Sequence, residues 1–480
     1  MNRNQSHHPN NFESPRQARA VVVLLAALLL TLASCSKGNK QNVIVFMVDT
    51  LRADHLGYHG YGRATSPNLD RFAARAAVFR ANYSQSSRTG PSVASLFTGL
   101  HVRSHGVLNP LDQWDGKGVL GEESQTLAEV LSEAGYACRA IVANPNVYEQ
   151  FGFGQGFDQY RHVDLFTTAP DINTLSSQWI DELTKGQSPF FLYLHYMEPH
   201  SPYTAPPPSN RLFVDKGYRG PITGEHRQID GILAGAVGVN DADKAHLTAL
   251  YDQEIASWDL AFGRFMRYLE SRGVLDDTVV VVVSDHGEEF FDHGAVLHGY
   301  TLYNEQLHVP LVIAAPGIEA GRTIETVTRN IDLLPTLLEL VGLGVPDGVQ
   351  GESLVPLIDG ADGEDRFVFS QTQIRAVKTV SCASFQARGW KLIETLVPEG
   401  TPPQLFNVAA DRGEQKDLFQ SMATRVKEIR GLRSEYLRSL PEGTSQTVTL
   451  DDDALEWMRK MGYTSGRGES DGDGRTKDGN

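Results

Sequence analysis

Residues 42–49 read N-V-I-V-F-M-V-D, a run of apolar and largely β-branched side chains that ends on a carboxylate. Such an uninterrupted run is typical of a parallel strand that is buried on both faces of its sheet. Similar runs recur at 138–143, 190–196, 278–284 and 309–314. Sheets of this kind bind ligands at the carboxyl ends of their strands. Asp49 and Asp285 each follow such a run directly, so we expect both near a binding site.

Helix-length patterns lie between these runs, at 68–78, 123–134, 173–185, 242–272 and 331–341. Strands that alternate with helices predict an α/β fold, a three-layer sandwich with a mostly parallel central sheet. From about Phe367 the pattern changes to shorter strand-like pieces and one helical stretch, at 367–371, 376–380, 390–394, 405–408 and 422–440. These pieces predict a smaller C-terminal α+β domain.

The first forty residues have the features of a targeting segment. Arg16 and Arg19 precede an apolar run at 20–30, which is too short to span a bilayer comfortably. Small residues then stand directly before Cys35, the pattern that a bacterial lipoprotein signal peptidase recognises. We expect cleavage before Cys35 and lipidation of its thiol; the alternative is an ordinary signal peptide cleaved near Ala33. Either cleavage exports the protein, and the lipid would anchor it to the cell envelope, in the periplasm or on the outer surface.

Composition narrows the classes of partner. The chain has 480 residues, 41% of them hydrophobic, and can therefore bury a large core. Its formal charge of −16 repels nucleic acids and anionic membranes on average, so no nucleic-acid partner is expected. An anionic ligand needs a local positive site. Cys138 and Cys382 follow no metal-ligand spacing, and they either pair in an oxidising compartment or remain two buried thiols.

Two segments place metal-binding side chains at strand ends. A carboxylate such as Asp49 is expensive directly after an apolar strand unless it binds something. The run at 278–284 is followed by Asp285 and His286, and Gly287 gives a tight turn. Two adjacent side chains that can ligate a metal form a stronger signal than either one alone. The structural alternative is a helix or turn cap for Asp49 and a plain strand-end turn for the second segment.

A third segment, T-G-P-S-V-A-S-L-F-T-G at 89–99, places a hydroxyl at a predicted helix start. Pro91 is suited to the first turn of a helix, so Thr89 would lie at the N-terminus. Free backbone N–H groups and the helix dipole favour an anion there. The structural alternative is that Thr89 only caps the helix.

Histidines supply the remaining candidates. His200 lies in the Pro-rich segment E-P-H-S-P-Y at 198–203, and His298 opens the segment H-G-Y. Either ring would reach a substrate or a leaving group from a loop, or would be structural. His195 is more typical of a core histidine. The same holds for three others, of which His105 is close enough to the third segment to stay open: His105, His293 and His308.

Together these segments, with S-D-H-G-E-E at 284–289 and H-G-Y-T-L-Y-N-E-Q-L-H-V-P-L at 298–311, resemble the catalytic domain of the sulfatase family in the alkaline phosphatase superfamily. The resemblance covers about 42–345 and continues weakly at 351–357, 405–408 and 414–418. It implies the three-layer sandwich of that superfamily.

The predicted segments are a lipoprotein signal peptide at 1–34, a linker at 35–41, the catalytic domain at 42–345, a C-terminal subdomain at 346–465 and a disordered tail at 466–480.

The resemblance also shows where this sequence departs from the family pattern. Sulfatases carry C/S-x-P-S-R-x-x-L-x-T-G, whose first residue is oxidised to formylglycine. Laid on 89–99, this signature places Thr89 at the nucleophile and Val93 at the arginine. A threonine has a secondary alcohol, which the formylglycine-generating route is not expected to handle. Thr50 replaces a second aspartate, and the lysine expected near Gly299 is missing, although His298 is close enough to take over its role.

These departures resemble the threonine-nucleophile branches of the superfamily, which are phosphodiesterases and phosphoethanolamine or glycerophosphate transferases. That resemblance implies one divalent ion held by Asp49, Thr89, Asp285 and His286. The ion would be Mn, Zn or Ca, and the nitrogen-containing ligand set favours Ca least.

The expected activity is metal-dependent hydrolysis of sulfate or phosphate esters, with Thr89 as a metal-bound nucleophile and with His200 and His298 acting on the substrate oxygens or the leaving group. The substrate would be a sulfated or phosphorylated small molecule, glycan or lipid. One alternative is a phosphodiesterase or phospho-group transferase acting on an envelope glycan or lipid. Another is an inactive, lipid-anchored glycan-binding protein. Loops such as 205–240 would set the specificity.

Overall fold

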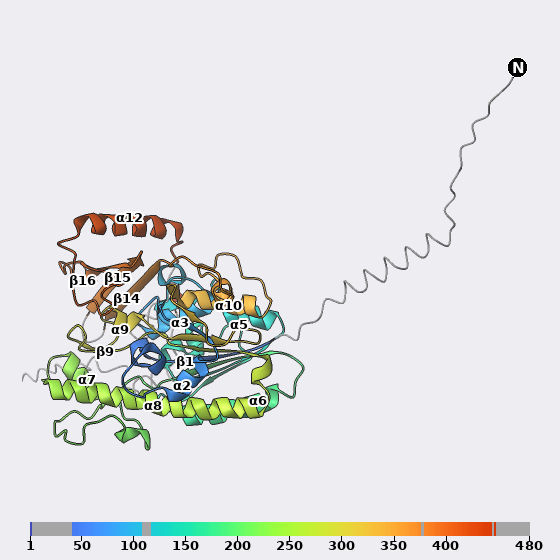
Figure 1. The fold of residues 1–480 in the computed structure, drawn as a ribbon, viewed down its shortest axis with the longest axis horizontal. Helices are drawn as coiled ribbons and strands as arrows, with labels where there is room; N and C mark the ends of the chain where they lie inside the picture. The colour runs from blue at the N-terminus through green and yellow to red at the C-terminus, as the bar shows by residue number, and fades with distance from the viewer. Residues whose placement is uncertain (2–40, 108–116, 376–378, 444–445, 448–480) are drawn as a thin grey trace, which may run out of the picture. The chain divides into compact units, whose positions relative to one another are not determined.

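A computed structural model describes Met1 and residues 41–107, 117–375, 379–443 and 446–447 (Figure 1). The predicted signal peptide, Cys35 with the rest of the linker up to Lys40, and the predicted tail at 466–480 lie outside the described residues. Within the ranges described, no helix combines the length and apolar character that crossing a bilayer requires.

A central sheet of eight strands confirms the predicted α/β architecture. Its order is β12-β2-β11-β8-β1-β7-β5-β6. The pairs around β1 are parallel, β11 runs antiparallel to its two neighbours, and β12 pairs parallel with β2. In sheet order the strands are β12 (Thr323–Ile324), β2 (Ala77–Phe79), β11 (Leu311–Ala314), β8 (Thr278–Val283), β1 (Asn42–Val48), β7 (Phe190–Tyr196), β5 (Ala137–Val142) and β6 (Gln159–His162).

Alternate residues of β1 face the two helical layers. Ile44, Phe46 and Val48 pack with α2 (Pro67–Ala73), α6 (Ala169–Leu183) and α8 (Asp241–Ser271). Phe46 makes edge contacts with Phe262 and Phe265 of α8, with ring centroids 5.2 and 5.9 Å apart. Full burial of each such side chain contributes about 1.5–3 kcal/mol. Figure 1 shows α8 running along this whole face.

The opposite face carries the helix that opens on Thr89. Val43, Val45 and Met47 of β1 pack with α3 (Thr89–Thr98), α5 (Leu127–Glu133) and α10 (Leu333–Leu340). Helices therefore cover both faces of the sheet, which explains why its central strands show no polar alternation. The remaining described helices are short: α4 (Val102–His105), α7 (His226–Leu233), α9 (Asn304–Leu307) and α11 (Val355–Ile358).

The C-terminal region forms a second, antiparallel sheet in the order β14-β15-β16-β17. Its strands are β14 (Val368–Arg375), β15 (Thr379–Ala387), β16 (Trp390–Val397) and β17 (Gln404–Phe406), and α12 (Ala423–Ser439) covers it, as seen at the top of Figure 1. Three two-stranded pairs complete the strands: β3 (Asn82–Tyr83) with β13 (Thr328–Arg329), β4 (Lys117–Val119) with β18 (Gln446–Thr447), and β9 (Glu289–Phe290) with β10 (Val296–Leu297).

Some predicted boundaries were wrong for local reasons. The helix predicted at 68–78 ends at Ala73, because Ala77–Phe79 is the apolar strand β2. The strand predicted at 367–371 is Val368–Arg375, and β15 continues to Ala387, beyond the strand end predicted at 380. Residues 376–378 of that second prediction lie outside the described residues. Cys138 lies in β5 and Cys382 in β15, and both are free buried thiols, so the disulfide alternative does not hold.

Candidate active site

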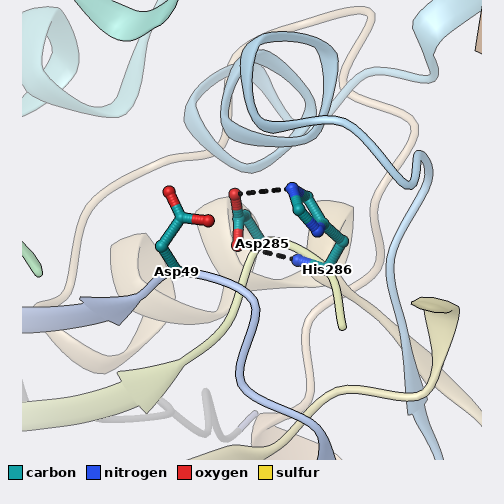
Figure 2. A group of neighbouring side chains, drawn as sticks. All are labelled: Asp49, Asp285 and His286. Carbon is teal, nitrogen blue, oxygen red and sulfur yellow. Dashed lines mark hydrogen bonds and ion pairs between the residues drawn. The ribbon is translucent and has the colours of Figure 1, made fainter. Parts of the chain in front are cut away.

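Three buried side chains gather at the carboxyl ends of β1 and β8. Asp49 follows β1 directly, and Asp285 and His286 follow β8; all three are 0% exposed. Each offers one ligand atom, and these atoms all lie within 4.8 Å of one another. Figure 2 shows the two carboxylates side by side, with the His286 ring turned back toward Asp285. The parallel pairing of β1 with β8 brings these strand ends together.

Each aspartate of this group has one carboxylate oxygen that makes no hydrogen bond with the described residues and could bind a cation. Asp49 Oδ2 accepts from Asn144 and Asp285 Oδ1 accepts from the Thr50 and His286 backbone N–H groups, at 2.6, 3.2 and 2.8 Å. The other oxygens, Asp49 Oδ1 and Asp285 Oδ2, are buried and make no hydrogen bond within the described part of the chain. Buried carboxylate oxygens in this condition are costly unless they bind a metal.

His286 makes a hydrogen bond through Nδ1, and its Nε2 is therefore left to bind a metal ion. His286 Nδ1 donates to the Gly287 carbonyl at 2.9 Å. Nε2 then keeps its lone pair, and it lies 3.3 Å from Asp285 Oδ2 and 3.3 Å from Thr89 Oγ1. A backbone carbonyl that fixes the ring in this way is the usual support of a metal-binding histidine.

The two aspartates respond differently to their surroundings. Burial raises the pKa of Asp49, but the His195 hydrogen bond and the neighbouring histidines outweigh it and bring the pKa down to about 2. Burial and the Asp49 charge raise the pKa of Asp285. Two carboxylates this close disfavour double ionisation. A divalent cation between them would remove that penalty.

Thr89 is the first residue of α3 and is 3% exposed. Its Oγ1 lies 3.3 Å from Asn144 Nδ2 as well as 3.3 Å from His286 Nε2. The predicted helix start is thus confirmed, with Pro91 in the first turn. Ser92 Oγ donates to the Asp285 carbonyl at 2.5 Å and so ties α3 to the end of β8. The first turn of an α-helix also points backbone N–H groups and its positive end toward this space.

His200 and His298 lie beside the candidate metal ligands, which are Asp49, Asp285 and His286. The His298 ring centroid is 4.3 Å from that of His286 and 5.1 Å from that of His200. His200 Nδ1 donates to the Ser201 carbonyl at 2.7 Å, which leaves Nε2 as an acceptor. Burial lowers the pKa of His200 and lowers that of His298 well below its ordinary value, so both rings are neutral near neutral pH.

A buried glutamate holds His298. His298 Nδ1 lies 2.9 Å from Glu288 Oε1, and Tyr203 donates to Glu288 Oε2 at 2.9 Å. Burial raises the pKa of Glu288 well above its ordinary value. This hydrogen bond holds the His298 ring at Nδ1 and leaves its Nε2 free of Glu288.

All six residues singled out from the sequence therefore gather in one place: Asp49, Thr89, His200, Asp285, His286 and His298. Two contributors were not predicted. His195 Nε2 lies 3.1 Å from Asp49 Oδ2, whereas we expected this histidine to be a core residue, and Asn144 contacts both Asp49 and Thr89. The signal for both was their position at the carboxyl ends of β7 and β5, parallel strands of the same sheet.

The three other histidines considered from the sequence do not contact this group. His105 Nε2 lies 2.9 Å from Ser95 Oγ behind α3, His293 Nδ1 lies 2.7 Å from Glu305, and His308 Nε2 donates to the Arg80 carbonyl at 2.9 Å.

The fold and this group of buried carboxylates and histidines define a hydrolase of the alkaline phosphatase superfamily, acting on sulfate or phosphate esters. Residues 41–343 match the model of the sulfatase family, and residues 291–438 match the model described as N-sulphoglucosamine sulphohydrolase, C-terminal. The chain belongs to the sulfatase family. Enzymes of this family use a divalent metal ion, and Asp49, Asp285 and His286 form a group that could hold it.

Known proteins agree with this assignment. The chain is 27% identical to an arylsulfatase of Clostridium perfringens, over 83% of this chain and 96% of the relative. It is 25% identical to an N-acetylglucosamine-6-O-sulfatase of Bacteroides thetaiotaomicron, over 90% and 92% of the two chains. Its fold is similar to that of the phosphonate monoester hydrolase of Agrobacterium radiobacter, with a TM-score of 0.68 at 21% identity, over 86% and 98% of the chains.

Proposed function

We propose that this sulfatase-family protein hydrolyses sulfate or phosphate esters with the unmodified alcohol of Thr89 as the nucleophile. The observation that carries the proposal is the position of Thr89 Oγ1, which is buried at the N-terminus of α3 and lies 3.3 Å from His286 Nε2. A hydroxyl in this place faces the group that could hold a cation and the positive end of a helix at the same time.

Asp49, Asp285 and His286 would hold the metal, with Thr89 beside them. A bound divalent cation would supply Lewis-acid charge that favours the ionised form of an alcohol and offsets negative charge on ester oxygens. Asn144 Nδ2, which contacts both Asp49 and Thr89, would keep the nucleophile oriented. The amino end of α3 would receive the remaining anionic oxygens of the ester.

The two neutral histidines would divide the proton transfers. His298, held at Nδ1 by Glu288, would donate a proton from Nε2 to the departing ester oxygen, and Glu288 would pass a proton to Nδ1. His200 keeps an unprotonated Nε2 and would accept the proton of the attacking hydroxyl or of the water that releases the group from Thr89. Positioned acids and bases of this kind contribute roughly 10²–10⁴-fold in rate.

For the substrate we propose a sulfated glycan. The N-acetylglucosamine-6-O-sulfatase, by its name, acts on a sulfated sugar, and it aligns with nearly the whole of this chain.

We also propose that the protein is exported and held to the cell envelope by lipid on Cys35, which follows small residues and an apolar run.

Three measurements on one preparation test the nucleophile. They are the metal content of the protein, the intact mass of the peptide that contains Thr89, and turnover of aryl sulfate, phosphate monoester and phosphate diester with added Mn, Zn or Ca. We expect bound metal, an unoxidised Thr89 and release of at least one anion. Thr89→Ala should lose at least ~100-fold in turnover and keep its metal, because three ligands remain.

Two further variants complete the test. Asp285→Asn should lose metal and turnover together. Thr174→Ala, an exposed helical threonine on α6, should change neither. Oxidised Thr89, or full activity in Thr89→Ala, would contradict the proposed nucleophile. Inactivity of the wild type on every ester would favour the glycan-binding alternative.

A further inference from the structure

A groove lies between α2 and α8 on the outer face of the helical layer, with a volume of about 470 Å³. Its floor is apolar and includes Phe72 of α2 with Phe262 and Met266 of α8. Leu275, which follows α8, closes one end. None of these residues belongs to the candidate metal ligands Asp49, Asp285 and His286, so the groove is separate from the candidate active site.

Arginines form the rim of this apolar floor. Arg71 and Arg75 come from α2 and the turn after it, and Arg267 comes from α8; all three are exposed. Glu270 is the acidic residue that lines the groove beside them. Among the described residues, neither Arg75 nor Arg267 is engaged in an ion pair, and the three arginines outnumber the one glutamate. In a chain of net charge −16, this is a local positive site of the kind that an anionic ligand needs.

The groove lies at the edge of the sheet where the described chain begins. Leu275 opens the short turn Leu275–Asp277 that leads into β8, and Thr278 starts that strand. Asn42, the first residue of β1, donates through Nδ2 to Thr278 Oγ1 at 3.4 Å. The segment that precedes Gln41 is therefore joined to the catalytic unit at the end that carries the groove. Fully extended, the six residue steps from Cys35 to Gln41 would span at most about 22 Å.

We propose that this groove binds an anionic phospholipid of the membrane to which the protein is anchored. The arginines would take the phosphate, because a guanidinium matches phosphate oxygens in pairs. The apolar floor would take the first methylene groups of an acyl chain. Membrane contact at this edge follows from the anchor proposed at Cys35, but binding of a lipid by the groove itself does not require it.

The test is a calorimetric titration of the full chain with soluble short-chain lipids below their micelle concentration, so that the anchor plays no part. The probes are dihexanoyl phosphatidylglycerol, dihexanoyl phosphatidylcholine and inorganic phosphate. We expect saturable binding of the phosphatidylglycerol, at least ~10-fold weaker binding of the phosphatidylcholine and no binding of phosphate alone. Equal affinity for the two lipids, or equal binding of phosphate, would overturn the proposal.

Variants tie the binding to the groove. Arg75→Glu combined with Arg267→Glu should weaken phosphatidylglycerol binding at least ~10-fold, and the matching double glutamine variant should weaken it less. Arg438→Glu on α12 is the control and should leave it unchanged. Turnover of a soluble ester should be the same in all four proteins, which separates this inference from the proposed catalytic function. Undiminished lipid binding in the double glutamate variant would overturn the assignment.

Discussion

In this site, the atoms available to a metal ion are side-chain atoms that make no hydrogen bond with described residues outside the site. Asp49 and Asp285 each commit one carboxylate oxygen to neighbouring donors and leave the other buried without a hydrogen bond. His286 commits Nδ1 to a backbone carbonyl and leaves Nε2. The three uncommitted atoms have the chemistry of a metal site, and Thr89 Oγ1 is a further oxygen at its edge.

Glu288→Gln should show whether Glu288 only holds the His298 ring in place or also supplies it with a proton. A glutamine amide can still donate to His298 Nδ1 and hold the ring, but it cannot pass on a proton. Turnover of 4-nitrophenyl sulfate, whose leaving group needs little protonation, should fall less than about 5-fold. Turnover of an alkyl or sugar sulfate should fall about 10²-fold or more. Steady-state assays across a series of leaving groups measure this difference, and an equal loss on all esters would contradict the relay.

Glu254→Gln should make the protein more stable at alkaline pH. Burial, with the nearby Glu198 charge, raises the pKa of Glu254 to about 8, above the ordinary value of 4.5. Because the folded pKa is the higher one, the stabilisation by the protonated form is complete below pH 4.5 and is lost as the pH rises toward 8. The wild type should lose up to about 1.4 kcal/mol per pH unit in that window relative to the variant. Urea unfolding at pH 5 and pH 8.5 tests this, and a constant difference between the proteins would refute it.

Residue types and strand positions were sufficient to predict Asp49, Thr89, Asp285 and His286 as a group. His195 is buried inside β7 as expected of a core histidine, but its contact with Asp49 was not predicted, because it depends on which strand neighbours β1. Strand order in a sheet is set by long-range packing, which the local pattern does not contain. Glu288 could not be assigned as the partner of His298 for the same reason, since the loop between them had no predictable shape.

At the scale of elements, β14 links the C-terminal sheet to both loops of the candidate site. Ser370 Oγ donates to the Ser84 carbonyl at 2.7 Å, and the Gln371 N–H donates to the Gln85 carbonyl at 2.9 Å, both in the segment before Thr89. Thr372 Oγ1 donates to the Gly299 carbonyl at 2.9 Å, next to His298. Gly299 has φ of +88°, and a Cβ there would lie 2.4 Å from the Arg88 side chain, so glycine is required. The edge strand β14 is thus hydrogen-bonded both to the segment before Thr89 and to the residue after His298.

Thr372→Val should weaken both stability and catalysis. The variant leaves the Gly299 carbonyl without its donor, at a cost of about 1–3 kcal/mol in the free energy of unfolding. Displacement of His298 should lower kcat on esters with poor leaving groups more than it raises KM. Thr372→Ser keeps the hydroxyl and is the control. Unfolding curves and kinetics measured together would reveal a purely structural role if stability fell while kcat stayed constant.

Elements of the catalytic domain were predictable because each long apolar run and each amphipathic stretch is a strong local signal. The strand at 42–48 and the long helix were placed to within a residue. The C-terminal strands were predicted less accurately, because they alternate buried and half-buried residues and their ends depend on pairing with neighbours.

At the scale of the whole molecule, a buried ion pair connects the C-terminal sheet to the loop that carries His298. Lys391 of β16 is 1% exposed, and its Nζ lies 2.8 Å from Glu414 Oε1 and 3.0 Å from Asn304 Oδ1. Glu414 Oε2 accepts from the Asn304 N–H at 2.6 Å, and its carbonyl lies 3.1 Å from His293 Nε2. These contacts hold the C-terminal sheet against α9, which follows the loop that carries His298.

Lys391→Met should destabilise the protein by about 3–5 kcal/mol, because it leaves the Glu414 carboxylate buried without a counter-charge. The double variant with Glu414→Gln should recover much of that loss. Equilibrium unfolding of the two single variants and the double variant gives the coupling energy. Additive losses in this cycle would show that Lys391 and Glu414 are not energetically coupled.

The seven residues of β1 connect two opposite ends of the sheet. At about 3.3 Å per residue, some 23 Å separates the attachment point of the N-terminal segment from Asp49. Anything attached to the N-terminal segment, such as the lipid proposed at Cys35, would therefore join the catalytic domain at the end of β1 opposite Asp49. Removal of such an attachment should leave the turnover of soluble esters unchanged.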